Sequence, residues 1–241
     1  MDVDEERRKI AWFIKCGLTV LVTILAIAAV VQAGKVIIAT AGGGGLMKEK
    51  ELPIYCVETE KPQVALSFDA AWGNDDTAKI LEILKKHDVH VTFFMTGGWV
   101  SSYPDDVKAI AEAGHDLGNH SENHKKMSQL SAQECKEEIM KVHDKVKELT
   151  GKDMMLFRPP YGDYNDTLIN VCKENGYYPI QWDVDSLDWK NYGVQSVIDT
   201  VCNHKHLGNG SIILCHNGAK YVWNGCPYIL VYLRQGHWQY R

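Results

Sequence analysis

Short apolar segments alternate with amphipathic helical segments along the chain from residue 64 to residue 215. Apolar, β-branched or aromatic runs predict strands at 64–68, 90–95, 116–118, 154–157, 177–182 and 211–215. Helical periodicity predicts helices at 77–87, 104–113, 164–175 and 194–204, and a longer helix that begins at a capping box at 131–134. This alternation is typical of α/β folds with parallel strands covered by helices. We expect a distorted, closed or nearly closed (β/α) barrel, with an open doubly wound sheet as the alternative.

The N-terminal region is predicted to be separate from this domain. Residues 16–34 contain no charged side chain and are long enough to cross roughly 30 Å of hydrocarbon. Basic residues precede this segment, so the positive-inside rule predicts a cytoplasmic tail at 1–15, a single-pass transmembrane helix in the cell membrane and an extracytoplasmic remainder. Residues 35–61 are interpreted as a tether. The alternatives are a signal peptide cleaved near Ala41, which would give a secreted form, and a buried core helix.

Charge and cysteine usage exclude several classes of function. The formal net charge is −5 and no long basic run occurs, which argues against nucleic acid as a partner. The seven cysteines form no C-x-x-C pair, so a zinc ribbon is excluded. The chain beyond the N-terminal region is long enough to bury one sizeable core as a single domain.

Titratable side chains follow five of the predicted strands, namely Asp69, His120, Arg158, Asp183 and His216. Because the carboxyl ends of parallel strands meet at one mouth of a β/α barrel, these side chains are expected to converge there. Such convergence indicates an enzyme active site rather than a set of unrelated loop residues.

Two histidines four residues apart, His120 and His124, add a candidate metal site. On a first helical turn, residues with this spacing share one face, so both imidazoles could reach the same ion. Imidazole suits zinc, cobalt, nickel or iron, and a site with two histidines leaves room for a carboxylate and a water.

The chain also resembles the polysaccharide deacetylases of carbohydrate esterase family 4, the NodB-homology family, over about residues 62–221. Five motifs carry the resemblance: Ser67-Phe68-Asp69, His120-Ser121-Glu122-Asn123-His124, Arg158-Pro159-Pro160-Tyr161-Gly162, Asp185-Ser186-Leu187-Asp188-Trp189 and Leu214-Cys215-His216. The second, third and fourth of these are specific, whereas the first and fifth would mean little alone. The resemblance implies a barrel of the polysaccharide deacetylase type.

The resemblance also implies catalytic roles. Asp69 would be the catalytic base, steadied by Arg158. His216 would be the general acid, oriented by Asp188. The main-chain amide of Tyr161 would help to hold an oxyanion.

The same family pattern implies how metal and sugar are held. His120 and His124 would be the paired ligands of a divalent metal, with zinc expected and cobalt or nickel as alternatives. Trp189 would form a wall of the substrate pocket, and an indole offers a flat apolar face for a sugar ring.

One departure from the family pattern concerns the metal. The family motif has two adjacent aspartates, of which the second is the third metal ligand, whereas Asp69 is followed by Ala70 here. Asp75 is the predicted replacement ligand, with Asp76 or additional water as alternatives. The competing interpretation is that this Asn-Asp-Asp stretch caps the helix that begins near residue 77.

A second departure lies at the C-terminus, where residues 222–241 do not resemble the family. Residues 223–227 lack a helical pattern, and residues 231–234 could form a lone strand. We expect a truncated C-terminus and an incomplete barrel that exposes apolar surface.

The sequence therefore predicts a metal-dependent N-deacetylase that hydrolyses the acetamido group of N-acetylhexosamine units in a cell-wall glycan such as peptidoglycan. Similarity to a sporulation-type branch of the family suggests the spore cortex as its setting. The alternatives are a catalytically silent glycan-binding homologue and a hydrolase of another non-peptide C–N bond.

Overall fold

The computed structural model describes residues 50–236 and 238–240. Glu51–Arg241 forms one compact unit, and the fold below is the fold of this unit. The transmembrane anchor predicted at 16–34 and most of the predicted tether lie outside the described residues. Within the described part of the chain, no helix combines the length and the apolar character needed to cross a bilayer.

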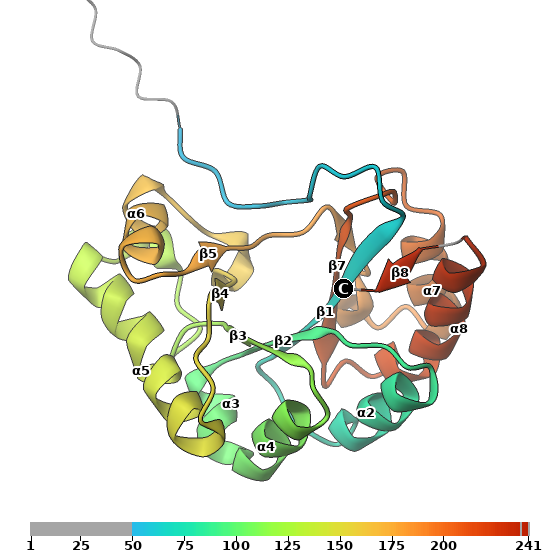
Figure 1. The fold of residues 1–241 in the computed structure, drawn as a ribbon, viewed down its shortest axis with the longest axis horizontal. Helices are drawn as coiled ribbons and strands as arrows, with labels where there is room; N and C mark the ends of the chain where they lie inside the picture. Colours follow the sequence, from blue (N-terminus) through green and yellow to red (C-terminus); the bar gives the residue numbers. More distant parts are fainter. Residues whose placement is uncertain (1–49, 237, 241) are drawn as a thin grey trace, which may run out of the picture. The chain divides into compact units, whose positions relative to one another are not determined.

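One parallel sheet forms the centre of the unit, with helices packed around it (Figure 1). The strands are β1 (Gln63–Ala70), β2 (Thr92–Met95), β3 (Asp116–Asn119), β4 (Leu156–Phe157), β5 (Tyr178–Pro179), β6 (Val184–Asp185), β7 (Ile212–Asn217) and β8 (Gln239–Tyr240). They lie in the order β5-β4-β3-β2-β1-β7-β6, and β8 pairs with β1. All these strand pairs are parallel, as the sequence predicts.

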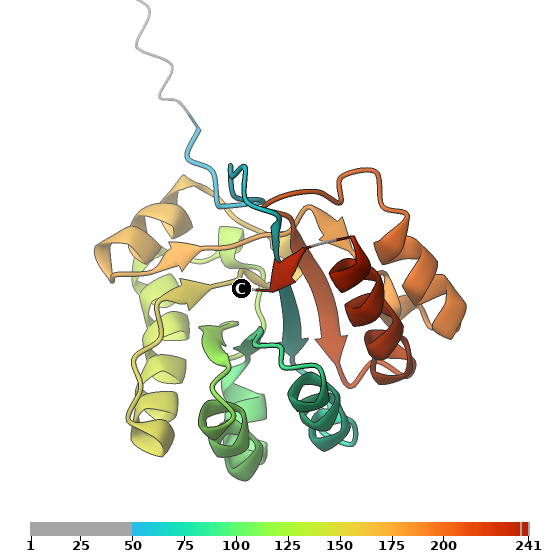
Figure 2. The same cartoon turned by 45° about the vertical axis from the view of Figure 1, so that its right-hand side comes forward.

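Seven helices of the described chain cover this sheet (Figure 2). They are α2 (Thr77–Lys86), α3 (Gly97–Ser102), α4 (Pro104–Glu112), α5 (Ala132–Thr150), α6 (Asp166–Glu174), α7 (Val194–Cys202) and α8 (Val222–Gln235). The predicted capping box is confirmed, since Ser131 and Glu134 bond reciprocally at the start of α5. Four elements, α3, α8, β6 and β8, were not predicted from the sequence.

The sheet does not close into a barrel. Its two edge strands, β5 and β6, are each two residues long, and no pairing joins them within the described residues. Ile54 pairs with Ile180 just beyond β5, and Cys56 pairs with Ser211 at the start of β7. The fold is therefore an open, curled, parallel partial barrel. Part of the segment predicted as a tether is hydrogen-bonded to it.

The predictions that residues 223–227 are not helical and that residues 231–234 form a lone strand were wrong. Residues 222–235 form α8, which packs against α7 and α2. The buried positions of α8 are 222, 225, 226, 229, 230 and 233, which is the spacing of one helix face. Gly225 and Pro227 disguised this spacing because both residues disfavour helix interiors. Burial of this face against the domain outweighs their unfavourable propensity.

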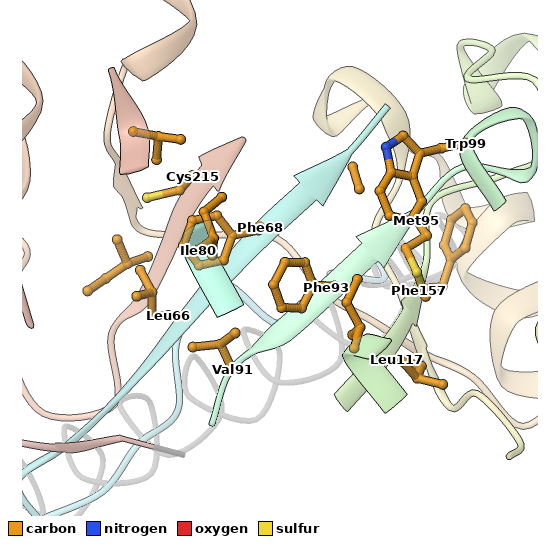
Figure 3. Packing of buried hydrophobic residues seen from close by; sticks show 14 of the residues in the cluster. Leu66, Phe68, Ile80, Val91, Phe93, Met95, Trp99, Leu117, Phe157 and Cys215 are labelled. Carbon is orange, nitrogen blue, oxygen red and sulfur yellow. The ribbon is translucent and has the colours of Figure 1, made fainter. Parts of the chain in front are cut away.

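Side chains along β1 point alternately into the apolar core and toward the candidate site. Leu66 and Phe68 belong to the main apolar cluster, where the Phe68 and Phe93 rings stack 5.4 Å apart (Figure 3). Successive side chains of a strand point to opposite faces, so Asp69 points away from this cluster. The packing of Phe68 thereby fixes the direction of the neighbouring carboxylate.

Candidate active site

The strand ends bring four of the five predicted site segments together. Asp69 on β1 is the register partner of His216 on β7. His120 follows β3 directly, and the main-chain N–H of Arg158 donates to the carbonyl of Asn119 at the end of that strand. Hydrogen-bonded neighbouring strands therefore position the carboxylate, the two imidazoles and the guanidinium at one edge of the sheet.

Asp69 and Arg158 form a buried ion pair. Nη1 of Arg158 lies 2.7 Å from Oδ1 of Asp69, and both side chains are almost fully buried. Burial alone would raise the pKa of Asp69, but the positive charges of Arg158 and of nearby histidines outweigh burial and hold that pKa below its ordinary value. Asp69 is therefore ionised at neutral pH.

The guanidinium of Arg158 is held from several sides. It packs over the rings of Phe94, at 4.0 Å, and of Trp182, at 5.7 Å. Nη2 donates to the carbonyl of Gln181 at 3.2 Å, whereas Nε has no hydrogen-bond partner among the described residues. The packing and these bonds fix the direction in which Arg158 meets Asp69.

His120 faces the other carboxylate oxygen of Asp69. Its Nε2 lies 3.4 Å from Oδ2, and its Nδ1 lies 2.7 Å from the main-chain carbonyl of Arg158. Since a carbonyl only accepts, Nδ1 carries the hydrogen and Nε2 is left with a free lone pair. Burial lowers the pKa of His120 to about 4, so this imidazole is neutral at physiological pH.

His120 and His124 lie on a loop, so the expectation of a first helical turn was wrong. Ser121 and His124 have φ of 67° and 52°, and the Ser121 hydroxyl accepts a hydrogen bond from the His124 N–H at 3.0 Å. The buried carboxylate of Glu138 accepts bonds of 2.8 and 2.7 Å from the main-chain and side-chain nitrogens of Asn123. The two imidazoles still meet, with ring centroids 4.9 Å apart.

His216 is paired with Asp188. Oδ1 of Asp188 lies 2.7 Å from Nδ1 of His216, and Oδ2 accepts from the His216 main-chain N–H at 2.7 Å. Burial would lower the pKa of His216, but the hydrogen bond and the charge of Asp188 prevail and raise that pKa above its ordinary value. His216 thus remains a proton donor at higher pH than a free imidazole.

Replacing Asp188 by asparagine should lower the pKa of His216. The variant removes the negative charge that favours the imidazolium, while burial continues to favour the neutral ring. Titration of the His216 ring signals by NMR in both chains measures the shift. An unchanged midpoint would show that Asp188 does not control this proton.

These groups line one cavity of about 450 Å³. Its walls comprise Asp69, Ala71, Trp72, His120, His124, Tyr161, Trp182, Asp185, Trp189, Leu214 and His216. Trp189 and Tyr161 are about half exposed or more, and the ring of Tyr161 meets that of His124 at 4.6 Å. Tyr161 has φ of 60°, a left-handed conformation that is uncommon outside glycine and clusters at functional sites.

Two predicted residues lie outside this arrangement. Asp75 is exposed and does not line the cavity, so the structure does not bring this proposed third ligand to the histidines. The capping alternative also differs from the structure, because the Asp76 carboxylate accepts from the Gly218 N–H and not from α2. Asp183 bonds to the Ile212 N–H and supports β7.

The donor chemistry of the two histidines fits a divalent metal. A metal-binding imidazole commonly donates through one nitrogen to a carbonyl or carboxylate and ligates through the other, as the bonding of His120 would allow. Within residues 50–236 and 238–240, however, no group of three or more His, Cys, Asp or Glu side chains is arranged to hold an ion. The structure therefore supplies two imidazole ligands for a metal ion, and Asp75 is not placed to be the third ligand.

Comparison with known proteins identifies the family. The family model described as polysaccharide deacetylase matches residues 57–180, more than half of the chain. The chain belongs to the polysaccharide deacetylase family. This family comprises hydrolases that act on carbon–nitrogen bonds other than peptide bonds.

Curated relatives of this family are similar over most of the domain. A peptidoglycan-N-acetylglucosamine deacetylase of Bacillus cereus is 35% identical over 181 residues, covering 73% of this chain and 83% of that protein. An uncharacterized 30.6 kDa protein of Geobacillus stearothermophilus is 40% identical over 170 residues, covering 69% of this chain. The match spans 63% of that relative, less than two thirds of its length.

A solved structure from the same family has a similar fold. A CE4 family pseudoenzyme from Bacillus anthracis gives a TM-score of 0.75 at 31% identity, covering 78% of this chain and 66% of that one. A mutant of that protein, described as having restored enzymatic activity, gives a TM-score of 0.75 at 32% identity. The open partial barrel is thus a fold found among solved members of the family.

Five residues that line the cavity were not assigned to the site from the sequence: the small or aliphatic Ala71 and Leu214, and the aromatic or charged Trp72, Trp182 and Asp185. Trp182 is the last residue of the strand predicted at 177–182 and Asp185 lies in the fourth family motif, so their positions were available signals. Trp72 follows Asp69 by only three residues, but an isolated Trp in a loop gives no periodic pattern.

Proposed function

We propose that this chain is a metal-dependent N-deacetylase acting on N-acetylhexosamine units of a cell-wall glycan such as peptidoglycan. The observation that carries the proposal is the pairing of an ionised carboxylate and a protonatable imidazole in one cavity. Asp69 is held ionised by Arg158, and His216 is held protonatable by Asp188. A proton acceptor and a proton donor are the two groups that amide hydrolysis requires.

The proposed reaction assigns one proton to each of these groups. Asp69 accepts a proton from water as the water oxygen bonds to the acetamide carbon, and the main-chain N–H of Tyr161 helps to stabilise the developing oxyanion. His216 then protonates the amide nitrogen as the C–N bond breaks, giving acetate and a free amine on the sugar. Both protons thus pass through groups that line the same cavity.

His120 and His124 would hold the metal, with zinc as the preferred ion and cobalt or nickel as alternatives. When bound, the ion polarises the carbonyl and lowers the pKa of water. Neutral His120, with Nε2 unprotonated, is ready to ligate without losing a proton.

The aromatic walls support a sugar as substrate. Trp189, Trp72 and Tyr161 line the cavity, and aromatic faces pack against the apolar faces of pyranose rings. The similarity to a Bacillus cereus peptidoglycan-N-acetylglucosamine deacetylase favours the same glycan class. We place the domain outside the cell on the transmembrane helix predicted at 16–34, with the spore cortex as its setting.

A second candidate is a catalytically silent glycan-binding protein. Ala70 favours it, because this buried apolar residue occupies the position where the family carries a metal-binding aspartate. The similarity to a CE4 family pseudoenzyme supports the same alternative. Hydrolysis of another non-peptide C–N bond is the third candidate.

Acetate release by the purified full-length chain tests these candidates. With N-acetylglucosamine oligomers and Zn²⁺, we expect acetate and free amine in equal amounts, and loss of both after chelation. Retention of the glycan without acetate would identify a silent binding protein. Acetate or ammonia from simple amides but not from the sugar would favour the third candidate.

Ala70 ends β1 and packs in the apolar cluster, so an aspartate there must turn from the core toward the two histidines in order to bind the ion. If it does so, replacing Ala70 by aspartate should tighten zinc binding at least about tenfold, because even outer-shell changes at metal sites alter affinity by ~10–100-fold. Without zinc, the new carboxylate should lower the melting temperature, since Ala70 is fully buried. Added zinc should recover that loss. Calorimetric titration and thermal melts measure both effects, with Ala70→Asn as the matched uncharged control. Equal zinc affinity in the Asp and Asn variants would refute a ligand role at this position.

A further inference from the structure

Trp72 stacks on the imidazole of His216. The two ring centroids are 5.4 Å apart and the ring planes are inclined by 29°. Trp72 is 50% exposed, so it covers the histidine from the solvent side of the cavity without being part of the apolar core. The proposed function uses this indole only as one wall of the cavity, and neither the sequence motifs nor the proton transfers of the proposed reaction involve it.

The main chain beside Trp72 is fixed to the segment that follows His216. The Gly73 carbonyl accepts a hydrogen bond of 2.7 Å from Nε1 of Trp99 and one of 3.3 Å from Nδ2 of Asn217. Asn217 is the residue next to His216 on β7. The loop that carries the indole is therefore tied to the strand that carries the imidazole.

A second connection joins the same two segments. The Gly218 N–H donates to both carboxylate oxygens of Asp76, at 2.9 and 3.0 Å. Gly218 has φ of 89°, and a Cβ at this position would lie 2.7 Å from the Trp72 carbonyl oxygen. Only glycine allows the two main chains to approach so closely. The indole and the imidazole are thus held in place by bonds to two residues that follow Trp72, Gly73 and Asp76.

Several charged groups act on the His216 ring. Asp188 bonds to it, Asp69 and Asp185 act on it through their negative charges, and His124 lies within electrostatic range. The face of an indole attracts a cation within about 6 Å of its ring centre. Trp binds cations through its ring face more strongly than Tyr or Phe does. Trp72 presents this face to the imidazole of His216, which carries a positive charge before it donates its proton.

We propose that Trp72 is a positioning residue for His216, holding the imidazolium against Asp188 so that its proton reaches the departing amine. The inference rests on the proposed N-deacetylase function. The hydrogen bond to Asp188 fixes the position of Nδ1 but still allows the imidazole ring to tilt. An indole stacked on the ring restricts this tilt. The opposite ring nitrogen is thereby kept directed at the substrate.

Two substrates with different leaving groups distinguish this role from a structural one. An N-acetylglucosamine oligomer releases a basic amine that must be protonated as the C–N bond breaks. 4-Nitrophenyl acetate releases a stable phenolate that needs no proton. A residue that positions the general acid should therefore affect the first substrate far more than the second.

Trp72→Leu in the full-length chain should lower kcat on the oligomer roughly 10–100-fold, the size of a small misplacement of a catalytic group. The rate on 4-nitrophenyl acetate should stay within about threefold. Trp72→Phe, which keeps an aromatic face, should recover most of the oligomer rate. Tyr228→Ala, at an exposed aromatic residue on α8, is the matched control and should change neither rate. Equal losses on both substrates, or a change in KM alone, would overturn the proposal.

NMR of the His216 ring gives a reading that does not depend on activity. In the unchanged chain the stacked indole should shift the ring signals by its ring current. In Trp72→Leu this shift should vanish and the pKa of His216 should fall, because the cation–π contact is lost. Ring signals and a midpoint unaffected by the substitution would refute the stacking role. If neither substrate is hydrolysed by the unchanged chain, the proposed function fails, and the NMR measurement alone decides the role of Trp72.

Discussion

Replacing Arg158 by methionine is expected to lower the free energy of unfolding by about 3–5 kcal/mol at neutral pH, the usual cost of removing one partner of a buried ion pair. Arg158 is fully buried, and its guanidinium lies 2.7 Å from Asp69. Methionine fills much of the same space, so the loss arises mainly from the unpaired carboxylate. Urea denaturation of both chains measures the difference.

The loss of stability in Arg158→Met should depend on pH, and this dependence would identify Asp69 as its origin. In the unchanged chain the pKa of Asp69 is lowered, so its contribution to stability is present above the unfolded pKa and is lost as pH falls through the folded pKa. In Arg158→Met, burial should raise the pKa of Asp69, and the difference between the chains should narrow as acid neutralises the carboxylate. Lys108→Met, which breaks the exposed pair with Asp105, should change stability by less than about 1 kcal/mol. If the loss of stability in Arg158→Met does not change with pH, it arises from altered packing and not from the unpaired Asp69 carboxylate.

Replacing His216 by alanine should lower kcat on N-acetylglucosamine oligomers by about 10²–10⁴, the usual contribution of a general acid. Zinc affinity should be unchanged, because His216 is not one of the proposed ligands. In the unchanged chain, kcat/KM should fall as pH rises through the raised pKa of His216, since the acid then loses its proton.

The alanine variant should lose this alkaline decline in rate. His206→Ala is the matched control, since its imidazole is exposed and lies outside the cavity. Its oligomer rate should stay within about twofold, as expected for a surface substitution. Retention of the unchanged rate by His216→Ala would remove the proposed general acid.

The alternation of strand and helix predicted the sheet because each segment there follows a clear period. The predicted runs 64–68 and 211–215 overlap β1 and β7, which pair directly. The edge strands were harder to predict. The run at 177–182 yielded only the two residues of β5, and β6 was missed because a strand of two residues gives no detectable alternation. Edge pairing with residue 54 depends on tertiary contacts, which local sequence does not encode.

The site was predictable where its residues follow central strands. Asp69, His120, Arg158 and His216 meet as the strand-end argument predicts, because parallel strands place their carboxyl ends on one side. Asp75 and Trp72 show the limit of that argument. Both lie in the loop after β1, yet Trp72 reaches the cavity and Asp75 faces solvent. The loop takes its path from bonds to Gly218 and Trp99, which are distant in sequence.

The rate of acetate release from N-acetylglucosamine oligomers, compared between the unchanged full-length chain and Asp69→Asn in the presence of Zn²⁺, tests the account most directly. Asparagine keeps the size of the side chain but cannot accept the proton of the attacking water. We predict that the unchanged chain releases acetate at least about a hundredfold faster than the variant. Equal rates in the two chains, or no acetate from either chain while zinc and glycan are bound, would contradict the proposal that Asp69 is the base of a deacetylase.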